Sequence, residues 1–392
     1  MSDVAERLEE LRDRGLYRQL RLVSGPQGPR VLLNGRPVLL LCSNNYLGLA
    51  DHPKVRGAAA EAAMRWGAGA GASRLVSGNM EPHRRLESRL AEFKGYDAAL
   101  LFGSGYLANN GVIAALAGAG EVVFSDELNH ASIVDGCRLS RAETFVYRHG
   151  DLDHLAWGLG RAGGRGSLIV SDGVFSMDGD VAPLPGLLEL ARRHGARLMI
   201  DEAHATGTLG RDGRGSVAAS GLSGEVDVVV GTLGKALGSY GAYVCANAET
   251  IDLLLNTARP FVFSTAPPPP SVAAAGAALE LVSPQRVERL QANAECFRAA
   301  LTAAGLDVGS SQTQIVPIEV GAAEPTMALC ERLLEREVFA QGIRPPTVPA
   351  GSSRLRFTVM ATHRAAELER AAKLVGAAAR ELGLVAPQSV AA

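Results

Sequence analysis

The sequence predicts an α/β fold, with a mostly parallel sheet flanked by helices and a smaller α+β domain at the C-terminal end. Short apolar runs alternate with helical patterns between about residues 98 and 246. These runs are continuous rather than alternating, which is typical of parallel strands that are buried on both faces. The length of 392 residues also exceeds one typical hydrophobic core and therefore favours two domains.

Apolar runs predict the strands of the main sheet. They are AALLF (98–102), EVVF (121–124), SLIVSD (167–172), RLMIDEA (197–203), DVVVG (227–231) and GAYVCA (241–246). Amphipathic stretches lie between several of them, such as LPGLLELARRHG (184–195), which predicts a helix packed on the sheet. In such sheets, ligands bind outside the carboxyl ends of the strands, where the connecting loops gather.

The segments outside this core predict the remaining elements. The stretch VLLNGRPVLLL (31–41) carries an Asn-Gly turn between apolar runs, which predicts a β-hairpin. After the core, the pattern predicts Ala-rich helices (271–304), a strand (314–320), a helix near 325–341, a strand (354–359) and a final helix at about 363–383. We therefore expect an N-terminal helix and hairpin arm (1–50), a large domain (51–284) and a small α+β domain (285–392).

Composition limits the expected partners and location. The net charge of −2 gives no electrostatic reason to expect nucleic acid or an anionic membrane as a partner. The first 20 residues alternate acids and bases and lack the apolar core of a secretory signal, and no stretch has the pattern of a membrane span. The five cysteines have no metal-binding spacing. We therefore expect a cytoplasmic protein without a metal site.

Three short segments follow consecutive predicted strands and should converge at one edge of the sheet. They are SDGVFSMDGD (171–180), DEAHATG (201–207) and GTLGKALG (231–238). Parallel strands place such segments side by side at their carboxyl ends. This edge should therefore combine hydroxyls, a carboxylate, an imidazole and an amine, from Ser176, Thr232, Asp201, His204 and Lys235.

Each of these residues also has an ordinary structural interpretation. A lone lysine at a strand end more often extends its ammonium group to solvent than takes part in chemistry. Gly234-Lys235 is not a Walker phosphate loop, because Val229 and Ala236 stand where that motif needs glycine and Ser or Thr. Asp201 alone is consistent with a cap on the next helix, and His204 alone with a structural histidine. The combination on one sheet edge favours chemistry.

That combination fits pyridoxal 5′-phosphate (PLP). The PLP aldehyde needs a lysine amine for a Schiff base, and the pyridine nitrogen needs a carboxylate to remain protonated. A lysine amine among apolar groups and near other positive charge is a usable nucleophile and base. We therefore expect Lys235 to bind the aldehyde and Asp201 to contact the ring nitrogen.

Two further segments complete the expected cofactor site. FGSGYLANNG (102–111) follows a strand and opens a helix, so the amides of Gly105 and Tyr106 can bind the phosphate. An ordinary strand–helix turn is the alternative. His130 follows another strand, in FSDELNHAS (124–132). Its imidazole can stack on the pyridine face, and the alternative is a hydrogen bond at the start of a helix.

These motifs resemble those of the α-oxoamine synthases, fold-type I PLP enzymes that condense an amino acid with an acyl thioester and release CO₂. The resemblance covers nearly the whole chain. It is carried by GLYRQLR (15–21), SNNYLGLA (43–50), GAGASRLVSG (69–78), the three sheet-edge segments and RPPTVPAGSSRLRFT (344–358).

The resemblance implies a role for each residue of the cofactor site. It implies that Lys235 also removes the substrate Cα proton, that His204 with Ser176 reaches the phenolic oxygen of PLP, and that His130 stacks on the ring. It assigns phosphate contacts to Gly105, Tyr106 and Thr232, and to Ser264 and Thr265 from the other subunit of a homodimer with shared active sites.

The resemblance also implies the substrate contacts. Arg356 should hold the amino-acid carboxylate as a two-pronged fork, helped by Asn44. Arg18 and Thr347 match positions that contact substrate, although Arg21 lies close to Arg18 and is the alternative. Ser73 stands where glycine-specific relatives have threonine, and a serine leaves room for the methyl group of alanine.

Ser73 does not separate the relatives that use L-alanine from those that join glycine to acetyl-CoA. The stretches RPPTVPAGS (344–352) and STAPPPP (264–270) resemble the relatives that use L-alanine and a pimeloyl thioester more closely. We therefore favour these substrates, with the acyl group carried on coenzyme A or on an acyl carrier protein. The free-energy difference that selects alanine over glycine is small, because one methyl group in a pocket changes binding by about 1–3 kcal/mol. A relative that joins glycine to acetyl-CoA and another fold-type I enzyme, such as an aminotransferase, are the alternatives. A non-enzymatic regulator would require a DNA-binding or sensory module, and the sequence has no pattern of one.

Overall fold

The computed structural model describes residues 3–385 of the chain. The chain divides into two compact units. Unit 1 consists of residues 1–48, 177–179 and 289–392, and unit 2 consists of residues 49–176 and 180–288. The N-terminal arm and the C-terminal segment thus belong to one unit. The division along the chain into 1–50, 51–284 and 285–392 stays our proposal.

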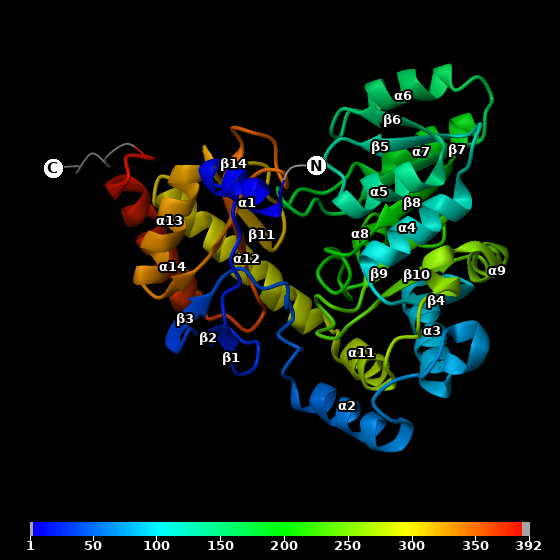
Figure 1. Ribbon diagram of the computed structural model, residues 1–392, viewed down its shortest axis with the longest axis horizontal. Coiled ribbons are helices and arrows are strands. Elements are labelled where there is room, and N and C mark those ends of the chain that lie inside the picture. The colour runs from blue at the N-terminus through cyan, green and yellow to red at the C-terminus, as the bar shows by residue number, and fades with distance from the viewer. Residues whose placement is uncertain (1–2, 386–392) are drawn as a thin grey trace. The chain divides into compact units, whose positions relative to one another are not determined.

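Unit 2 is built on a seven-stranded sheet with the order β4-β10-β9-β8-β7-β5-β6 (Figure 1). The strands are β4 (Ala98–Phe102), β5 (Val122–Asp126), β6 (Glu143–Tyr147), β7 (Ser167–Asp172), β8 (Arg197–Asp201), β9 (Val228–Thr232) and β10 (Ala242–Ala246). The pairs from β6 through β5, β7 and β8 to β9 are parallel, whereas β10 runs antiparallel to β9 and β4. The expected mostly parallel sheet is confirmed, and β6 is an additional strand that we did not predict.

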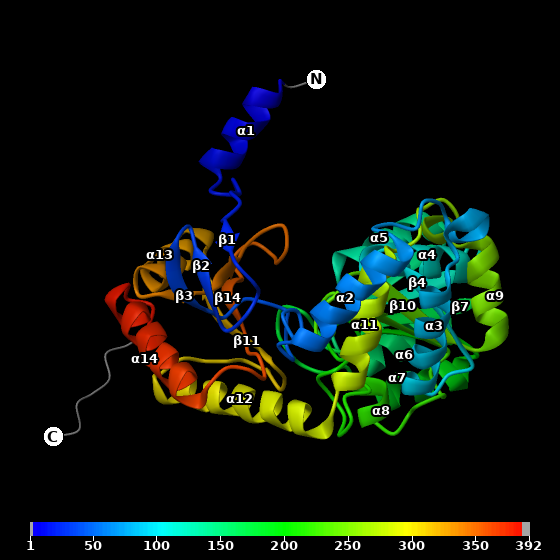
Figure 2. The same ribbon diagram turned by 90° about the horizontal axis from the view of Figure 1, so that it is seen from below.

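Helices cover both faces of this sheet. The helices of unit 2 are α2 (Pro53–Trp66), α3 (Glu81–Lys94), α4 (Gly105–Leu116), α5 (Ala131–Ser140), α6 (Leu152–Arg161), α7 (Leu184–His194), α8 (Ser216–Ala219), α9 (Ala248–Thr257), α10 (Arg259–Val262) and α11 (Pro269–Leu281), with a π-helical turn (Arg74–Gly78). Val228 and Val230 of β9 share a core with α4, α5 and α9, whereas Val229 shares one with α6 and α7. Figure 2 shows the sheet between these two groups of helices. Two buried faces explain the continuous apolar runs.

Unit 1 contains two smaller sheets. Their orders are β1-β2-β3-β12 and β11-β14-β13. The strands are β1 (Val23–Ser24), β2 (Arg30–Leu33), β3 (Arg36–Leu40), β11 (Ile315–Gly321), β12 (Val338–Phe339), β13 (Gln341–Ile343) and β14 (Ser353–Thr358). The helices are α1 (Val4–Asp13), α13 (Ala323–Glu335), α14 (Ala365–Glu381) and α12 (Pro284–Ala303), which begins in unit 2. The hairpin turn has φ values of 50° at Asn34 and 80° at Gly35, as a type I′ turn requires.

The helix expected near 325–341 ends earlier than predicted. It stops at Glu335, so the prediction for its last residues was wrong. Glu337 has a φ of 62°, a left-handed conformation that ends a helix, and β12 and β13 follow at once.

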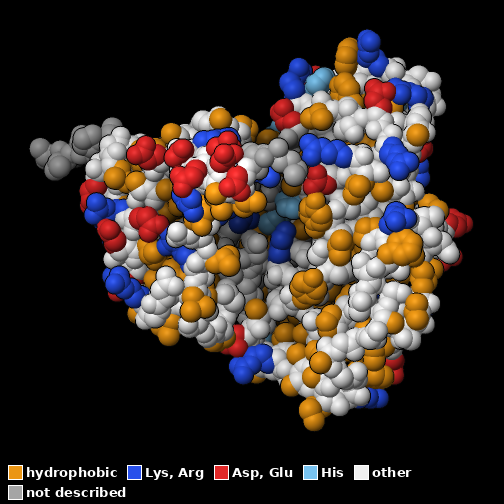
Figure 3. All heavy atoms as spheres, viewed as in Figure 1, with side chains coloured by type: hydrophobic (Ala, Val, Ile, Leu, Met, Phe, Trp, Pro, Cys, Tyr) orange, Lys and Arg blue, Asp and Glu red, His pale blue; other side chains and the backbone are white. Residues whose placement is uncertain are grey.

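The surface of the described residues is mixed in charge. Basic and acidic side chains both occur on the face shown in Figure 3, with acidic side chains over α1. Within residues 3–385 no helix is both long enough and apolar enough to span a bilayer. In the same range, no group of three His, Cys, Asp or Glu side chains is arranged to hold a metal ion.

Candidate active site

Lys235 lies in the turn that follows β9. Its Nζ atom is 2.8 Å from Nε2 of His204. Gly238 closes this turn with a φ of +58°, and a Cβ atom there would lie 2.4 Å from the backbone nitrogen of Ala50. A side chain at position 238 would therefore displace the turn. The structure thus places the expected amine and imidazole in contact.

Asp201 is the last residue of β8 and is 4% exposed. Its Oδ1 accepts a 2.8 Å hydrogen bond from the amide of Ala203, which caps a run of turns over residues 203–208 and not the helix that we considered. Its Oδ2 accepts a 2.6 Å hydrogen bond from the side-chain amide of Asn109, in α4. Because each bond uses one lone pair of one oxygen, the capping contact does not exclude a ligand contact.

Glu202, the next residue, fixes the segment that carries Asp201 and His204. Its carboxylate is fully buried, forms an ion pair with Lys94 of α3, and accepts hydrogen bonds from the hydroxyl of Ser216 (2.9 Å) and the amide of Val217 (2.7 Å). Successive side chains at a strand end leave on opposite faces. Asp201 is therefore held from the α4 face and Glu202 from the face of α3 and α8.

His130 begins α5 and is linked to Asp201 through buried side chains. Its Nδ1 accepts from the amide of Ser132 at 3.3 Å and lies 2.7 Å from the Ser132 hydroxyl, and that hydroxyl lies 2.8 Å from the Asn109 amide nitrogen. The helix-start hydrogen bond that we considered is therefore present, and stacking on a ligand stays a proposal. Desolvation lowers the pKa of His130, Asp201 raises it, and Lys235 lowers it further.

The first turn of α4 can bind an anion. Ser104 caps it, because its side chain accepts from the amide of Leu107 and its carbonyl accepts from that of Ala108. Within residues 3–385, no acceptor is found for the amides of Gly105 and Tyr106. Two free amides at a helix N-terminus suit a phosphate group.

The other predicted cofactor contacts lie in unit 2. Ser176 is buried in the loop after β7. The Thr232 hydroxyl donates to the carbonyl of Gly241 (3.1 Å) and accepts from the amide of Gly234 (3.2 Å). Ser73 and Thr265 pair as an isolated antiparallel bridge, which brings Ser264 to the same region.

A charged histidine anchors the loop that carries Ser176. His149 lies between two carboxylates, 3.0 Å from Asp126 and 2.8 Å from Asp180, and packs edge-on against Phe175. Hydrogen bonds to Asp126 and Asp180 raise the pKa of His149 to about 10. The protonated ring thus connects Asp180 and Phe175 to Asp126 at the end of β5.

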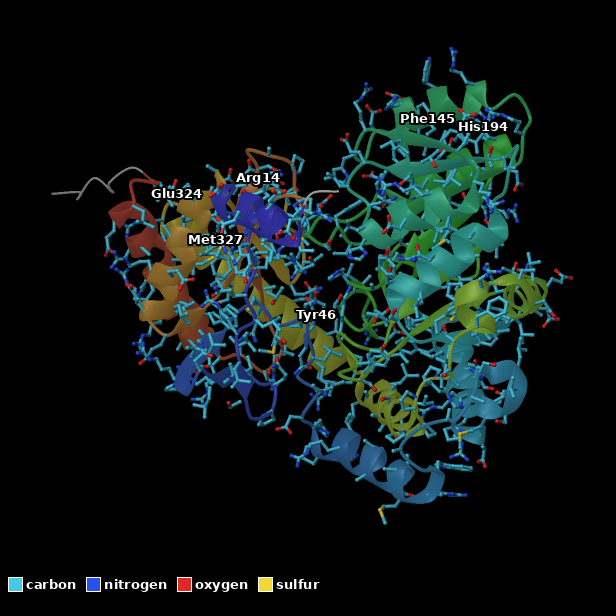
Figure 4. All side chains as sticks on the ribbon, viewed as in Figure 1. Arg14, Tyr46, Phe145, His194, Glu324 and Met327 are labelled. Carbon is cyan, nitrogen blue, oxygen red and sulfur yellow. The ribbon has the colours of Figure 1, made fainter. Side chains whose placement is uncertain are left out.

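We expect His149→Gln to destabilise the protein in a pH-dependent way. The folded pKa is above the unfolded value, so the stabilisation is complete below a pH of about 6.5 and is lost as the pH rises through about 10. Because His149 is partly exposed, we expect the variant to lose about 1 kcal/mol of unfolding free energy at pH 6. This loss corresponds to a Tm lower by roughly 2–4 °C. Thermal unfolding from pH 6 to 10 measures it, with the exposed His194→Gln (labelled in Figure 4) as control. If the Tm difference between the wild type and His149→Gln increased with pH, the proposal that the His149 ring is protonated would be contradicted.

In unit 1, Arg356 lies beside Asn44. Its Nη1 is 3.3 Å from Oδ1 of Asn44, and its Nη2 is 3.5 Å from the hydroxyl of Tyr46. Tyr46 (labelled in Figure 4) donates to the same Asn44 oxygen at 2.9 Å. Burial raises the pKa of Tyr46, and Arg356 opposes that rise. Sequence reasoning missed Tyr46, although it lies in the SNNYLGLA motif.

Arg18, Arg21 and Thr347 line one pocket of unit 1 with a volume of ≈ 840 Å³. Arg21 forms an ion pair with Glu331, and its guanidinium lies over the ring of Phe339. Arg18 is exposed and forms no hydrogen bond or ion pair with another residue of the described range. Arg18 is therefore the better candidate for a ligand contact.

The residues of unit 2 fit PLP. Lys235 offers an amine for the aldehyde, Asp201 a carboxylate for the ring nitrogen, and the first turn of α4 two amides for the phosphate. These groups follow β9 and β8, which are neighbours, and β4, which is joined to β9 through β10. His204 and His130 supply further polar contacts in the same region.

The chain resembles known proteins over nearly its whole length. Residues 36–375 match the family described as aminotransferase class I and II. The 8-amino-7-oxononanoate synthase of Geobacter sulfurreducens is 58% identical over 387 residues, which cover 97% of this chain and 99% of that protein. A structure of serine palmitoyltransferase from S. paucimobilis with bound PLP and myriocin has a TM-score of 0.93 at 33% identity, over 97% of this chain and 98% of that one. The 8-amino-7-oxononanoate synthase of Francisella tularensis has a TM-score of 0.76 at 28% identity, over 88% and 98%.

Proposed function

We propose that this chain, which belongs to the aminotransferase class I and II family, is a PLP enzyme that makes 8-amino-7-oxononanoate. It condenses L-alanine with a pimeloyl thioester and releases CO₂ and the free thiol, a step of biotin biosynthesis. The placement of the Lys235 amine 2.8 Å from His204, on the sheet whose strand β8 ends at Asp201, carries this proposal. The predicted family, fold class and cofactor are confirmed.

The residues of unit 2 would bind the cofactor and carry out the proton transfer. When bound, PLP supplies a ring that accepts the electrons left at the substrate Cα. Asp201 would keep the ring nitrogen protonated, because its buried carboxylate can accept a hydrogen bond from that N–H group. Lys235 would hold the aldehyde covalently, and its amine would serve as the base at the substrate Cα. His204 orients that amine from 2.8 Å, and Gly105, Tyr106 and Thr232 hold the phosphate.

The residues of unit 1 would bind the substrates. Arg356 would hold the carboxylate of alanine through two parallel hydrogen bonds, with Asn44 fixing the guanidinium from 3.3 Å. Arg18 and Thr347 would contact the acyl substrate from the ≈ 840 Å³ pocket. In unit 2, Ser73 would leave room for the alanine methyl group, and His130 would stack on the cofactor ring.

We expect Arg356→Lys to raise the KM for L-alanine roughly 10- to 100-fold, with a smaller effect on kcat. Lysine keeps the positive charge but cannot form the fork, and a charge-assisted hydrogen bond contributes about 1.5–3 kcal/mol. Steady-state kinetics with varied alanine measures this effect, and Arg36→Lys, at an exposed position of the hairpin, is the control. An unchanged KM for L-alanine would show that Arg356 does not bind the substrate carboxylate.

A homodimer with shared sites would place Ser264 and Thr265 against the phosphate in the partner subunit. The surface near the Ser73–Thr265 bridge supports this arrangement, because Val76 and Phe263 are 79% and 71% exposed. Large exposed apolar side chains that lie together are typical of interfaces.

Subunit complementation tests the shared sites. A double variant Ser264→Ala/Thr265→Ala and a Lys235→Ala variant are each expected to be nearly inactive. If the sites are shared, a mixed dimer holds one site with both changes and one intact site, so co-refolding should restore activity. Mixtures that stay inactive, although mass spectrometry detects the mixed dimer, would contradict the shared site.

The assignment is tested by thiol release with matched substrates. L-Alanine, glycine and L-serine are each supplied with pimeloyl-CoA, pimeloyl carrier protein or acetyl-CoA. We expect fast release with L-alanine and a pimeloyl donor, and 8-amino-7-oxononanoate as the product in mass spectrometry. Activity restricted to glycine and acetyl-CoA would reject this proposal and favour a different member of the same fold.

A further inference from the structure

A chain of hydrogen bonds leads from Asp201 through Asn109 and Ser132 to His130. We propose that Asn109 and Ser132 are positioning residues that hold the His130 imidazole neutral, with its proton on Nε2. Both residues are only 1% exposed, so water does not compete for these bonds. None of the predicted roles includes either residue.

Asp201 fixes the orientation of the Asn109 amide. A single Asn109 atom, Nδ2, lies 2.6 Å from Oδ2 of Asp201 and 2.8 Å from Oγ of Ser132. A carboxylate oxygen only accepts, and the reversed amide would place two acceptor oxygens 2.6 Å apart. The amino group therefore faces Asp201. Its two hydrogens are used by Asp201 and Ser132, so Oγ of Ser132 accepts from Asn109.

The direction of the next bond follows. Because Oγ of Ser132 already accepts from Asn109, its own hydrogen is available to Nδ1 of His130, 2.7 Å away. The backbone amide of Ser132 also donates to Nδ1, at 3.3 Å, and an amide N–H cannot accept. Two donors therefore meet at Nδ1, which must carry a lone pair. The proton of the neutral ring is then on Nε2.

The surroundings disfavour a second proton on this ring. His130 is the N-cap of the ten-residue helix α5, where the positive end of the helix dipole disfavours a positive charge. Lys235 acts in the same direction, and Asp201 opposes it. The residue as a whole is exposed although its Nδ1 is occupied. Nε2–H is thus the side of the ring that can donate to a ligand.

This protonation pattern decides what His130 offers to a substrate. A neutral ring with its proton on Nε2 donates a hydrogen bond to a substrate oxygen and adds no positive charge beside a protonated pyridine. The other tautomer would present a lone pair and repel the same oxygen. This consequence for turnover rests on the proposed function, whereas the protonation pattern does not.

Nitrogen NMR of protein labelled with [¹⁵N]histidine tests the pattern directly, on the full chain without added substrate. The His130 signals are identified by their absence in His130→Gln. In the wild type near neutral pH, we expect an unprotonated Nδ1 and a protonated Nε2. A proton on Nδ1, or on both nitrogens, would overturn the proposal whether or not any variant folds.

Two serine variants then separate positioning from ordinary stability. Ser132→Ala removes the hydroxyl donor, so the tautomer with its proton on Nδ1 should become detectable. Ser140→Ala is the control, because this buried serine lies in the same helix and donates to the carbonyl of Cys137 (2.6 Å) outside the chain of bonds. It should leave the His130 signals unchanged. A wild-type pattern in folded Ser132→Ala would overturn the role of Ser132.

Kinetics gives a second readout. The loss of one hydrogen bond predicts a kcat lower by about 3- to 10-fold in Ser132→Ala, with the KM for L-alanine within about twofold. An altered NMR pattern with an unchanged kcat would overturn the positioning role. If the wild type does not turn over the pimeloyl substrates, the proposed function fails, and the NMR measurement still decides the tautomer.

Discussion

Lys235→Ala is expected to abolish turnover, by roughly 10⁴-fold or more, while PLP remains bound without a covalent link. The amine has two proposed roles, as the covalent partner of the aldehyde and as the base at Cα, and general-base catalysis alone accounts for about 10²- to 10⁴-fold. Thiol release measures the loss, and PLP absorbance shows that cofactor is still bound. Lys54→Ala, at an exposed position of α2, is the control.

The covalent link is checked separately. Borohydride reduction followed by peptide mass spectrometry should place the adduct on Lys235 in the wild type and find none in the variant. Lys94 is the informative alternative, because it is a buried lysine of the same unit that is already paired with Glu202. An adduct at Lys94, or wild-type turnover in Lys235→Ala, would refute the assignment of the amine.

Asp201→Asn is expected to lower kcat by roughly 10²- to 10³-fold and to weaken PLP binding. The substitution keeps the side-chain shape and an oxygen that can still accept from Ala203 or Asn109, but it removes the negative charge. Without that charge the ring nitrogen loses its proton, and a preorganised electrostatic contact of this kind contributes about 10²- to 10³-fold. Kinetics and PLP titration by absorbance measure both effects.

Asp227→Asn is the matched control for this change. Asp227 accepts a 2.7 Å hydrogen bond from the amide of Leu198 in the same sheet, so its substitution also exchanges a carboxylate for an amide. It should leave kcat nearly unchanged. If both variants lost activity equally, the effect of Asp201→Asn would come from the sheet and not from a contact with the cofactor.

Much of the fold was predictable because its strands are buried on both faces. Successive side chains of β9 (Val228–Thr232) pack alternately against the core that contains α4 and the core that contains α6. Both sets of side chains must therefore be apolar, which gives a continuous apolar run in the sequence. The edge strand β6 lacks this signal, since residues such as Glu143 and Thr144 are exposed. The two- and three-residue strands β12 and β13 are too short for a periodic pattern to show.

The candidate site was predictable where chemistry requires a rare residue at a strand end, as at Lys235 and Asp201. Asn109 and Ser132 were not, because a polar residue inside a helix has the same pattern whether it faces solvent or a buried carboxylate. The environment of Lys94 was even harder to predict from the sequence. A lysine in the last turn of a helix is usually exposed, and only the tertiary structure shows that it is paired with Glu202.

The composition of unit 1 from distant parts of the chain has a consequence for biosynthesis on the ribosome. β3 pairs with β12 through Leu39 and Val338, and Leu39 and Leu41 belong to a core completed only by residues from Phe297 onward. At the usual speed of translation, about 15–60 s separate the emergence of these partners. During that interval the nascent N-terminal hairpin presents an unpaired edge and apolar side chains. It is therefore the segment for which a co-translational chaperone would matter most.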